Sequence, residues 1–480
     1  MFKGNHVGRR LGFALGAAAF CLASVSPGVL KGQSATAYYV RAGATGAANG
    51  LDWTNAFQTL PATLTRGQIY YIADGSYPSY TFSTPAAQAT VITIKKATPA
   101  SHGTSTGWLD TYGDGTANWA PITFNTSHWR FDGATGGGPG SWKSGHGFRF
   151  NNLACENAAF VSTANGLSNI TIRHVSFTQT GNTEVCSNAT VNAAHGIFTS
   201  TGGEGSIYDS LFEYLHFDNL GGLPFFMRGG RGNVIQYNYS GNICGKYVAD
   251  VNAHCAMTVV HGMEDMHFRY NYLAESPSSG GFVKNDYEVS TGIYIYGNVF
   301  RDGLPIACNT GTCDKWWIMN NTFTDLVTGP VAGSGKIGAT SVIYNNLVYA
   351  GKVISFSTSV NHAIHDYTWY SRIQRAACHM LAAPHDNVVT ARAGGCDAIS
   401  EAQDPFVDST GNAPEDFRLV ATIGNYAGRN VCEVLQCGGA AAAFNRDAFG
   451  RERGSDGTLD RGAYEHAPPT APSNLRLVRP

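Results

Sequence analysis

A short repeat of alternating apolar and polar residues, a high glycine content and the lack of helical periodicity together predict an all-β solenoid. Glycine accounts for 58 of the 480 residues, which indicates many turns because the usual share is roughly 7 %. Each repeat holds two or three short strands that cannot bury an apolar face alone, so the repeats must stack. The repeat is also shorter than a propeller blade of about 40–45 residues. We therefore expect a right-handed parallel β-helix with an N-terminal cap and a disulfide-bearing C-terminal insertion or cap.

The repeat is built around asparagines that follow short alternating strands. Copies of the pattern occupy residues 169–177, 233–238, 266–273, 292–300, 317–323 and 341–348. The key asparagines are spaced by 33, 27, 23 and 25 residues, at Asn238, Asn271, Asn298, Asn321 and Asn346. We expect these side chains to lie at turns and to stack as a ladder inside the coil, which is a structural role.

The first residues have the pattern of a secretory signal peptide, which we assign to residues 1–37. A basic start precedes an uncharged stretch over residues 11–30, and small residues at 35–37 suit a signal peptidase. A membrane anchor is the alternative because the apolar run is long enough to span a bilayer. Its alanines, its glycines and Pro27 favour the signal peptide. We expect a secreted, periplasmic or cell-surface protein that has no membrane contact after the signal is removed.

Cysteine usage agrees with export. Ten cysteines follow residue 37, and an even number in an exported chain indicates disulfides. The local pairs are Cys244–Cys255, Cys308–Cys313, Cys378–Cys396 and Cys432–Cys437. Pairing within these pairs is consistent with the sequence, but the sequence does not determine it.

The overall charge excludes one class of partner and makes local charge clusters informative. Lys and Arg number 32 and Asp and Glu number 34, and this balance argues against a nucleic-acid binder held by phosphate contacts. Only 14 % of the residues are charged, so a concentration of charge in one part of the chain indicates a site. We expect a monomer.

Segments at both ends of the chain resemble known proteins. Residues 45–57 and 72–77 look like the opening of many secreted bacterial right-handed β-helix proteins, and residues 404–408, 416–419 and 460–465 look like their close. The sequence therefore resembles the pectate-lyase-like superfamily over residues 38–466. This superfamily contains polysaccharide lyases, glycoside hydrolases, epimerases and non-catalytic surface proteins, so the resemblance implies the fold and leaves the activity open.

Two C-terminal segments depart from the repeat. Residues 375–440 interrupt it and carry four cysteines and an alanine run, so we interpret them as an insertion or cap on the last coil. Residues 467–480 form a Pro-rich tail.

A row of charged residues is the candidate site. The resemblance implies a groove along one sheet, where residues of neighbouring coils line up. Arg228 lies ten residues before Asn238, and His261 lies ten before Asn271. Lys284 lies fourteen before Asn298, and we assign the surplus to a longer turn at 285–291. The three side chains are thus expected on successive coils, about 4.8 Å apart.

This row suits β-elimination of a polysaccharide that contains uronic acid. A cation such as Arg228 would neutralise the substrate carboxylate, and Lys284 or His261 would remove the proton that this makes acidic. The other charged or polar residues expected near the row, as contacts to substrate, are Arg231, His254, Asp286 and Glu288.

Calcium is a cofactor that the resemblance implies, because related lyases often use it to neutralise the carboxylate. Acidic oxygens are its preferred ligands. Glu264 and Asp265 are our candidate ligands, and Asp286 and Glu288 could supply further oxygens. Adjacent strand residues point to opposite faces, so Glu264 and Asp265 can both serve only if they lie in a turn. We expect no other cofactor.

The most favoured function is thus an extracellular polysaccharide lyase, and two alternatives remain. A glycoside hydrolase would need two carboxylates on either side of the scissile bond, which Asp265 with Asp286 or Glu288 could provide. A non-catalytic, glycan-binding surface protein would carry the same charged row facing water.

Overall fold

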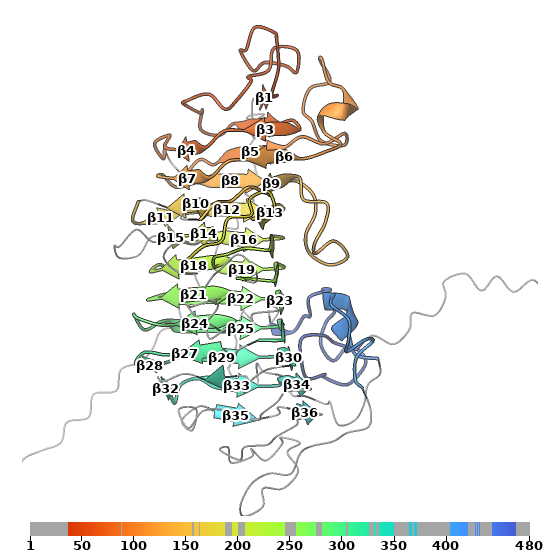
Figure 1. The fold of residues 1–480 in the computed structure, drawn as a ribbon. Helices are drawn as coiled ribbons and strands as arrows, with labels where there is room; N and C mark the ends of the chain where they lie inside the picture. The colour runs from red at the N-terminus through yellow and green to blue at the C-terminus, as the bar shows by residue number, and fades with distance from the viewer. Residues whose placement is uncertain are drawn as a thin grey trace, which may run out of the picture. The chain divides into compact units, whose positions relative to one another are not determined.

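The chain folds as a stack of coils whose strands form three parallel sheets, which have twelve, eleven and nine strands in the described residues (Figure 1). The computed structural model describes residues 37–87, 89–155, 158–162, 164–187, 194–199, 207–244, 256–274, 281–303, 306–325, 331–332, 336–349, 364–366, 369–371, 404–420, 428, 430, 432 and 444–466. Within these ranges every pair of named strands is parallel, and the strand order climbs the stack in chain order. This arrangement is the parallel β-helix that the sequence predicts.

The largest sheet has twelve strands in the described part of the chain. In spatial order they are β1 (Ala37–Val40), β2 (Ile69–Ile72), β5 (Ile92–Lys96), β8 (Trp129–Asp132), β12 (Ile170–Arg173), β16 (Leu211–Glu213), β19 (Val234–Gln236), β22 (Glu264–Arg269), β25 (Thr291–Tyr296), β29 (Trp316–Met319), β33 (Val342–Tyr344) and β35 (Ile364–Asp366).

The second sheet has eleven described strands. They are β3 (Gly75–Tyr77), β6 (Ala117–Trp119), β9 (Phe148–Phe150), β13 (Val175–Thr178), β17 (His216–Asp218), β20 (Tyr239–Gly241), β23 (Tyr272–Ala274), β26 (Val299–Arg301), β30 (Thr322–Thr324), β34 (Leu347–Tyr349) and β36 (Trp369–Ser371).

The third sheet, which carries the candidate site, has nine described strands. They are β4 (Tyr80–Phe82), β7 (Ile122–Phe124), β10 (Ala158–Ser162), β14 (His195–Phe198), β18 (Phe225–Arg228), β21 (Thr258–His261), β24 (Val283–Asn285), β27 (Ile306–Cys308) and β31 (Val331–Ala332).

The remaining described elements are short. Two two-stranded sheets pair β11 (Leu167–Ser168) with β15 (Ile207–Tyr208), and β28 (Thr312–Cys313) with β32 (Lys336–Ile337). Two 3₁₀ helices span Asp110–Tyr112 and Pro414–Phe417. In the described ranges we find no helix long and apolar enough to cross a membrane.

The alternation of side chains along each strand produces the core. In β18, Phe225 and Met227 are buried, whereas Phe226 and Arg228 are half-buried on the outer face. Because the strands are parallel and in register, like residues stack from coil to coil. The rings of Phe150, Phe177 and Phe217 stack in this way with centroids 5.2 and 4.8 Å apart. The apolar face of one coil is thus buried by the next.

The asparagine ladder is confirmed. Nδ2 of Asn238 donates to Oδ1 of Asn271 at 3.0 Å, and the same bond joins Asn271 to Asn298 and Asn298 to Asn321. Asn321 continues the ladder to Asn346 at 3.1 Å. Each asparagine is the second residue of a two-residue turn between the twelve- and eleven-stranded sheets. The first turn residue has a positive φ in each case, at Tyr237, Tyr270, Gly297, Asn320 and Asn345.

One predicted disulfide is confirmed, and one further disulfide joins two cysteines that are both described. Cys308 and Cys313 are bonded, as are Cys155 and Cys186. The other predicted pairs have at least one partner outside the described residues. Most of the signal peptide assigned to 1–37, most of the 375–440 segment and the whole 467–480 tail also lie outside them.

The described part of the C-terminal segment packs on the outer face of the eleven-stranded sheet. Phe406 and Phe417 contact each other and lie against Tyr349 and Tyr272 respectively, which belong to β34 and β23. Glu415 accepts a hydrogen bond from Nε1 of Trp142 at 2.7 Å. The segment therefore covers apolar residues of the coil, as a cap would.

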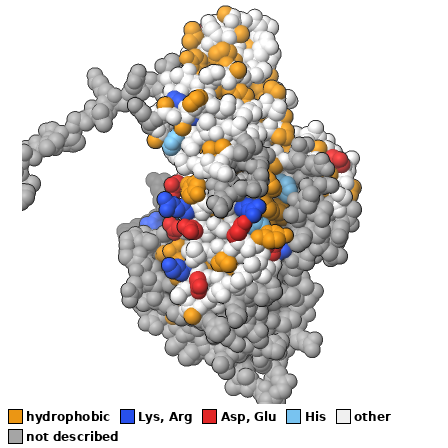
Figure 2. All heavy atoms as spheres, turned by 90° about the vertical axis from the view of Figure 1, so that its left-hand side faces the viewer, with side chains coloured by type: hydrophobic (Ala, Val, Ile, Leu, Met, Phe, Trp, Pro, Cys, Tyr) orange, Lys and Arg blue, Asp and Glu red, His pale blue; other side chains and the backbone are white. Residues whose placement is uncertain are grey.

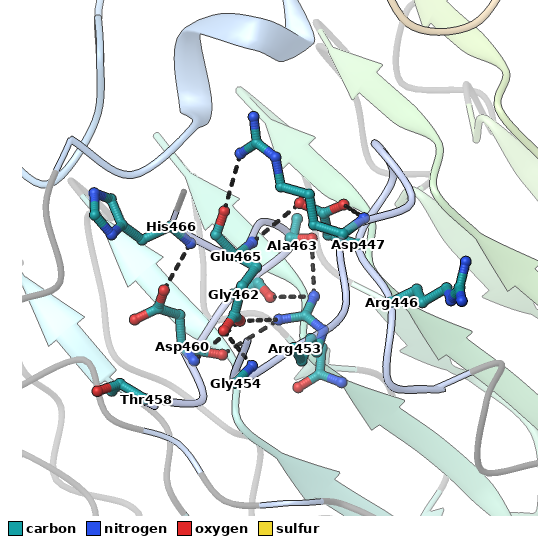
Figure 3. Close-up of polar contacts among 12 residues, drawn as sticks. Arg446, Asp447, Arg453, Gly454, Thr458, Asp460, Gly462, Ala463, Glu465 and His466 are labelled. Atoms are coloured by element: carbon teal, nitrogen blue, oxygen red, sulfur yellow. Dashed lines mark hydrogen bonds and ion pairs between the residues drawn. The ribbon is translucent and has the colours of Figure 1, made fainter. Parts of the chain in front are cut away.

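A buried polar network, which we call the C-terminal polar network, lies at the end of the described chain (Figure 3). It centres on Arg453, Asp460 and Glu465. The Arg453 guanidinium donates to the carbonyls of Gly462 and Ala463 at 3.0 and 2.9 Å. A carboxylate oxygen of Glu465 accepts the Asp460 N–H at 3.2 Å. The Ala463 N–H donates to Oγ1 of Thr322 in β30 at 2.9 Å, and this hydrogen bond connects the C-terminal polar network to the coil.

The C-terminal polar network is expected to make the stability of the protein depend on pH. Burial raises the pKa of Glu465 to about 7 and that of Asp460 to about 6. A raised carboxyl pKa means that the folded state binds the proton more tightly, so this stability is present below pH 4.5 and is lost as the pH rises through 7. We expect the free energy of unfolding in urea to fall by about 1–3 kcal/mol over that range from Glu465.

Glu465→Gln should remove most of that fall, since the glutamine does not titrate. Asp114→Asn changes an exposed carboxylate far along the chain and serves as the control, which should keep the wild-type pH profile. If the stability of Glu465→Gln still falls with pH as steeply as that of the wild type, the Glu465 carboxyl does not titrate in this range.

Candidate functional site

The outer face of β18, β21 and β24 brings the predicted row together. Arg228 is the register partner of His261, so the two side chains lie at the same level on neighbouring coils. Lys284 is instead the partner of Val259, two residues before His261 and on the same face of the sheet. The prediction of three successive coils is therefore correct, and Lys284 lies one side-chain position earlier along the strand than Arg228 and His261.

The physical reason for this offset is the length of one connection. Val259 and Glu264 pair with Lys284 and Thr291, so five residues in one coil correspond to seven in the next. The turn after β24 is thus two residues longer than the turn after β21. Counting back from the ladder assigns four extra residues to this turn. Asp286 consequently occupies the level next to His261.

Charged side chains gather at mid-height on this side of the molecule (Figure 2). Arg228 and Glu288 form a two-pronged ion pair, with Nη2 to Oε1 at 2.5 Å and Nε to Oε2 at 3.1 Å. Lys284 Nζ lies 2.9 Å from Oδ2 of Asp286. Arg228 lowers the pKa of the Glu288 carboxyl, and Glu288 in turn raises the pKa of Arg228. Both sides of the pair are therefore charged at neutral pH.

His261 is the buried member of the row. Its side chain is 2 % exposed, and its ring packs edge to face against Phe226 and Tyr287 with centroids 5.3 and 5.1 Å apart. Burial lowers the pKa of His261 below its ordinary value, against the opposing effect of Asp286 and Glu288. Nε2 of this ring has no hydrogen-bond partner among the described residues. The imidazole is therefore neutral at pH 7, and one of its nitrogens is unpaired within the part of the chain that the structure describes.

A hollow of about 790 Å³ adjoins the row where β18 and β21 end. It is lined by Asn165, Gly166, Tyr208, Gly229, Gly230, Arg231, Gly262 and Glu264. Gly230 has a φ of 105°, and a Cβ there would come within 1.8 Å of the Ile207 carbonyl oxygen, so only glycine fits. Because Gly229 and Gly262 directly follow Arg228 and His261, the hollow extends the row into a groove.

The candidate calcium ligands Glu264 and Asp265 begin β22. Asp265 has a φ of 49°, which breaks the strand alternation and leaves both Glu264 and Asp265 exposed, as the turn exception requires. Asp286 and Glu288, however, are each bound to a cation. Among the described residues no three His, Cys, Asp or Glu side chains gather closely enough to hold a metal. We derive no step through a calcium ion.

The structure also adds residues that the sequence did not single out. Tyr287 is 73 % exposed and lies beside His261, in the turn already assigned to 285–291. Asn309 donates to Oδ1 of Asp286 at 2.9 Å and fixes that carboxylate from the next coil. The signal for Tyr287 was its position between two acidic candidates. His254, which was expected to contact substrate, lies outside the described residues.

Comparisons with known proteins bear on the fold. No protein-family model matches the sequence, and no curated protein matches it as a relative. Among solved structures, pectate lyase Pel9A is similar with a TM-score of 0.46 and 13 % identity, covering 90 % of this chain and 98 % of its own. A family-6 alginate lyase, AlyGC, has a TM-score of 0.38 and 13 % identity over 64 % of this chain and 45 % of its own.

A third similar structure is that of XylC with xylose, at a TM-score of 0.35 and 9 % identity over 77 % of this chain and 86 % of its own. Such identities and scores say nothing of this chain's activity. The sheet topology itself shows that the protein is a parallel β-helix.

Proposed function

We propose that the protein is a polysaccharide lyase that cleaves an acidic, uronate-containing polysaccharide by β-elimination, with His261 as the base. The observation that carries the proposal is the neutral, buried His261 ring with an unpaired Nε2, at the same level as the Arg228 guanidinium. A neutral imidazole is the form that accepts a proton, and a cation beside it lowers the charge of the substrate carboxylate.

The step requires no redox partner. The guanidinium of Arg228 binds the uronate carboxylate and so acidifies the proton on the adjacent carbon. Nε2 of His261 takes that proton, and the electron pair of the C–H bond forms the carbon–carbon double bond. The C–O bond on the next carbon breaks, and the leaving sugar oxygen takes a proton from water. The products are a new chain end and an unsaturated sugar.

Lys284 and Glu288 support this step in different ways. Lys284 is ion-paired to Asp286, so it acts as a fixed positive charge on the same face, two residues along from His261. Glu288 holds the guanidinium of Arg228 in place through two hydrogen bonds. A charge that is already held in place stabilises the transition state without having to be reoriented during the reaction.

The hydrolase alternative is less well supported by this arrangement. A hydrolase needs one carboxylic acid that is protonated at working pH, and such acids have raised pKa values. Arg228 instead lowers the pKa of Glu288. Asp286 is ion-paired with Lys284 at 2.9 Å and accepts a hydrogen bond from Asn309, so its carboxylate oxygens are engaged by groups of the chain.

We further propose that the protein works outside the cytoplasm as a monomer. Two disulfides in the described residues, Cys155–Cys186 and Cys308–Cys313, fit an oxidising compartment. A groove on the outer face of the nine-stranded sheet suits an extracellular polysaccharide.

The proposal is tested by incubating the purified protein with polygalacturonate, alginate and neutral glucans, with calcium or with chelator. We expect ultraviolet absorbance from an unsaturated sugar to rise with one polyuronate and to persist in chelator, since Asp286 and Glu288 are already paired with cations of the chain. Reducing ends without absorbance would establish hydrolysis instead. If neither absorbance nor reducing ends appear with any of these polysaccharides, the proposal is contradicted and a non-catalytic glycan-binding protein is favoured.

A further inference from the structure

A second hollow, which we call the histidine basin, lies on the outer face of the eleven-stranded sheet, away from the nine-stranded sheet that carries the row. It spans β9, β13 and β17 and has a volume of about 410 Å³. β9 and β13 lie on the right in Figure 1. Its lining includes Lys143, His146, Arg149, Ser176 and His216. Arg149, Ser176 and His216 are register partners on three successive coils, so they form a row of their own.

Two imidazoles of the histidine basin have unpaired nitrogens. His146 is 1 % exposed, and its Nε2 has no hydrogen-bond partner in the described part of the chain. Nδ1 of His216 lies 3.0 Å from Oγ of Ser176, while its Nε2 is likewise buried without a partner in that part. The two rings lie nearly parallel with centroids 5.6 Å apart. Buried polar atoms in native proteins are paired as a rule, and here two neighbouring exceptions belong to rings that line one hollow.

Both rings are neutral in the absence of a ligand. Burial, with a smaller effect from His216, lowers the pKa of His146 to about 3. Burial, then Lys143 and Arg149, lower the pKa of His216 to about 4. A neutral imidazole carries one N–H donor and one acceptor nitrogen. A hydroxyl both donates and accepts, so it can pair with either Nε2 whichever tautomer is present.

The rim of the histidine basin is positively charged. Lys143 and Arg149 are both exposed, and Lys143 Nζ lies 4.6 Å from the centroid of the Tyr239 ring. Asp218 is the acidic residue among those that line the hollow. Two exposed cations beside unpaired imidazoles offer partners for a carboxylate and for hydroxyls at once, and a sugar acid carries both groups.

We propose that the histidine basin is a second binding site for an acidic sugar unit, whose carboxylate pairs with Lys143 and Arg149 and whose hydroxyls pair with Nε2 of His146 and His216. The inference rests on the proposed function for its ligand class, and it adds a site on a different sheet from the cleavage row. Such a site holds one part of a polyuronate chain while another part occupies the groove.

The test measures binding without turnover. In the full chain carrying His261→Gln, hexameric galacturonate and hexameric mannuronate are titrated by calorimetry, with maltohexaose as the neutral control. We expect one hexauronate to bind, and the added double substitution Lys143→Ala and Arg149→Ala to weaken the basin's affinity at least tenfold. The matched control is Arg130→Ala, an exposed arginine on the twelve-stranded sheet, which should leave binding unchanged.

A spectroscopic readout separates the sugar from a simple anion. The imidazole ¹⁵N resonances of His146 and His216 should shift with the hexauronate and should not shift with sodium sulfate at the same charge concentration. Equal shifts with sulfate, or affinity unchanged by the double substitution, would overturn the proposal.

The two proposals fail separately. Binding that depends on Lys143 and Arg149 in a protein that cleaves nothing would sustain the basin and refute the lyase. Cleavage of the polymer with a KM that is unchanged by the double substitution would sustain the lyase and refute the basin.

Discussion

Replacing His261 with glutamine is expected to lower kcat on the cleaved polyuronate at least a hundredfold, because a general base contributes about 10²–10⁴ to the rate. Glutamine is close in size to histidine and can occupy the same pocket beside Phe226 and Tyr287, so the fold should survive. The measurement is the initial rate of ultraviolet absorbance, together with a circular dichroism spectrum that matches the wild type. His102→Gln, on a half-buried histidine that stacks on Trp108 near the N-terminus, is the control and should keep full activity.

The pH profile distinguishes His261 from Lys284 as the base. Because burial holds the pKa of His261 below its ordinary value of 6.5, the base is already unprotonated at pH 7, and kcat/KM should fall only on the acid side of 6.5. A lysine base would instead give a rate that keeps rising into the alkaline range. An active His261→Gln variant together with an inactive Lys284→Ala variant would assign the base to Lys284.

Replacing Asn298 with alanine is expected to be the most destabilising single change in the ladder. Asn298 is fully buried, and its Oδ1 accepts from both the backbone and the side chain of Asn271. Its Nδ2 donates to Oδ1 of Asn321 and to the carbonyls of Phe268 and Tyr296. Alanine leaves several of these groups buried and unpaired at about 1–3 kcal/mol each, so we expect a loss of about 3–5 kcal/mol.

The measurement is urea unfolding followed by tryptophan fluorescence. Asn49→Ala is the matched control, because Asn49 is exposed and its side chain accepts a hydrogen bond from the Leu51 backbone, and it should cost less than about 1 kcal/mol. An Asn298→Ala loss no larger than that of the control would mean that the ladder contributes little to stability.

The ladder was predictable because it depends on spacing alone. In a stacked coil, a residue that recurs at one turn position must meet its copies, so the spacing of Asn271 and Asn298 along the chain is enough to pair them. Cys308 and Cys313 are five residues apart and bond within one turn. Cys155 and Cys186 are 31 residues apart, and their approach depends on loops whose paths the sequence does not determine.

The candidate site was predictable only to the level of the sheet face. Counting back from the ladder placed Arg228 beside His261, but it placed Lys284 one side-chain position away from its true neighbour. The ion pair between Arg228 and Glu288 joins residues sixty positions apart and depends on the length of one turn. The orphaned nitrogens of His146 and His216 depend on ring orientation, for which no spacing rule exists.

The ladder also allows the protein to change length in whole units. Successive ladder asparagines are separated by 33, 27, 23 and 25 residues and yet make the same bond. Excising residues 299–321 would bring the coil that ends in Asn298 onto the coil that ends in Asn346 with the acceptor still in place. The Cys308–Cys313 disulfide lies wholly inside that unit, so no unpaired thiol would remain. Gene duplication or deletion can therefore lengthen or shorten such a scaffold one coil at a time.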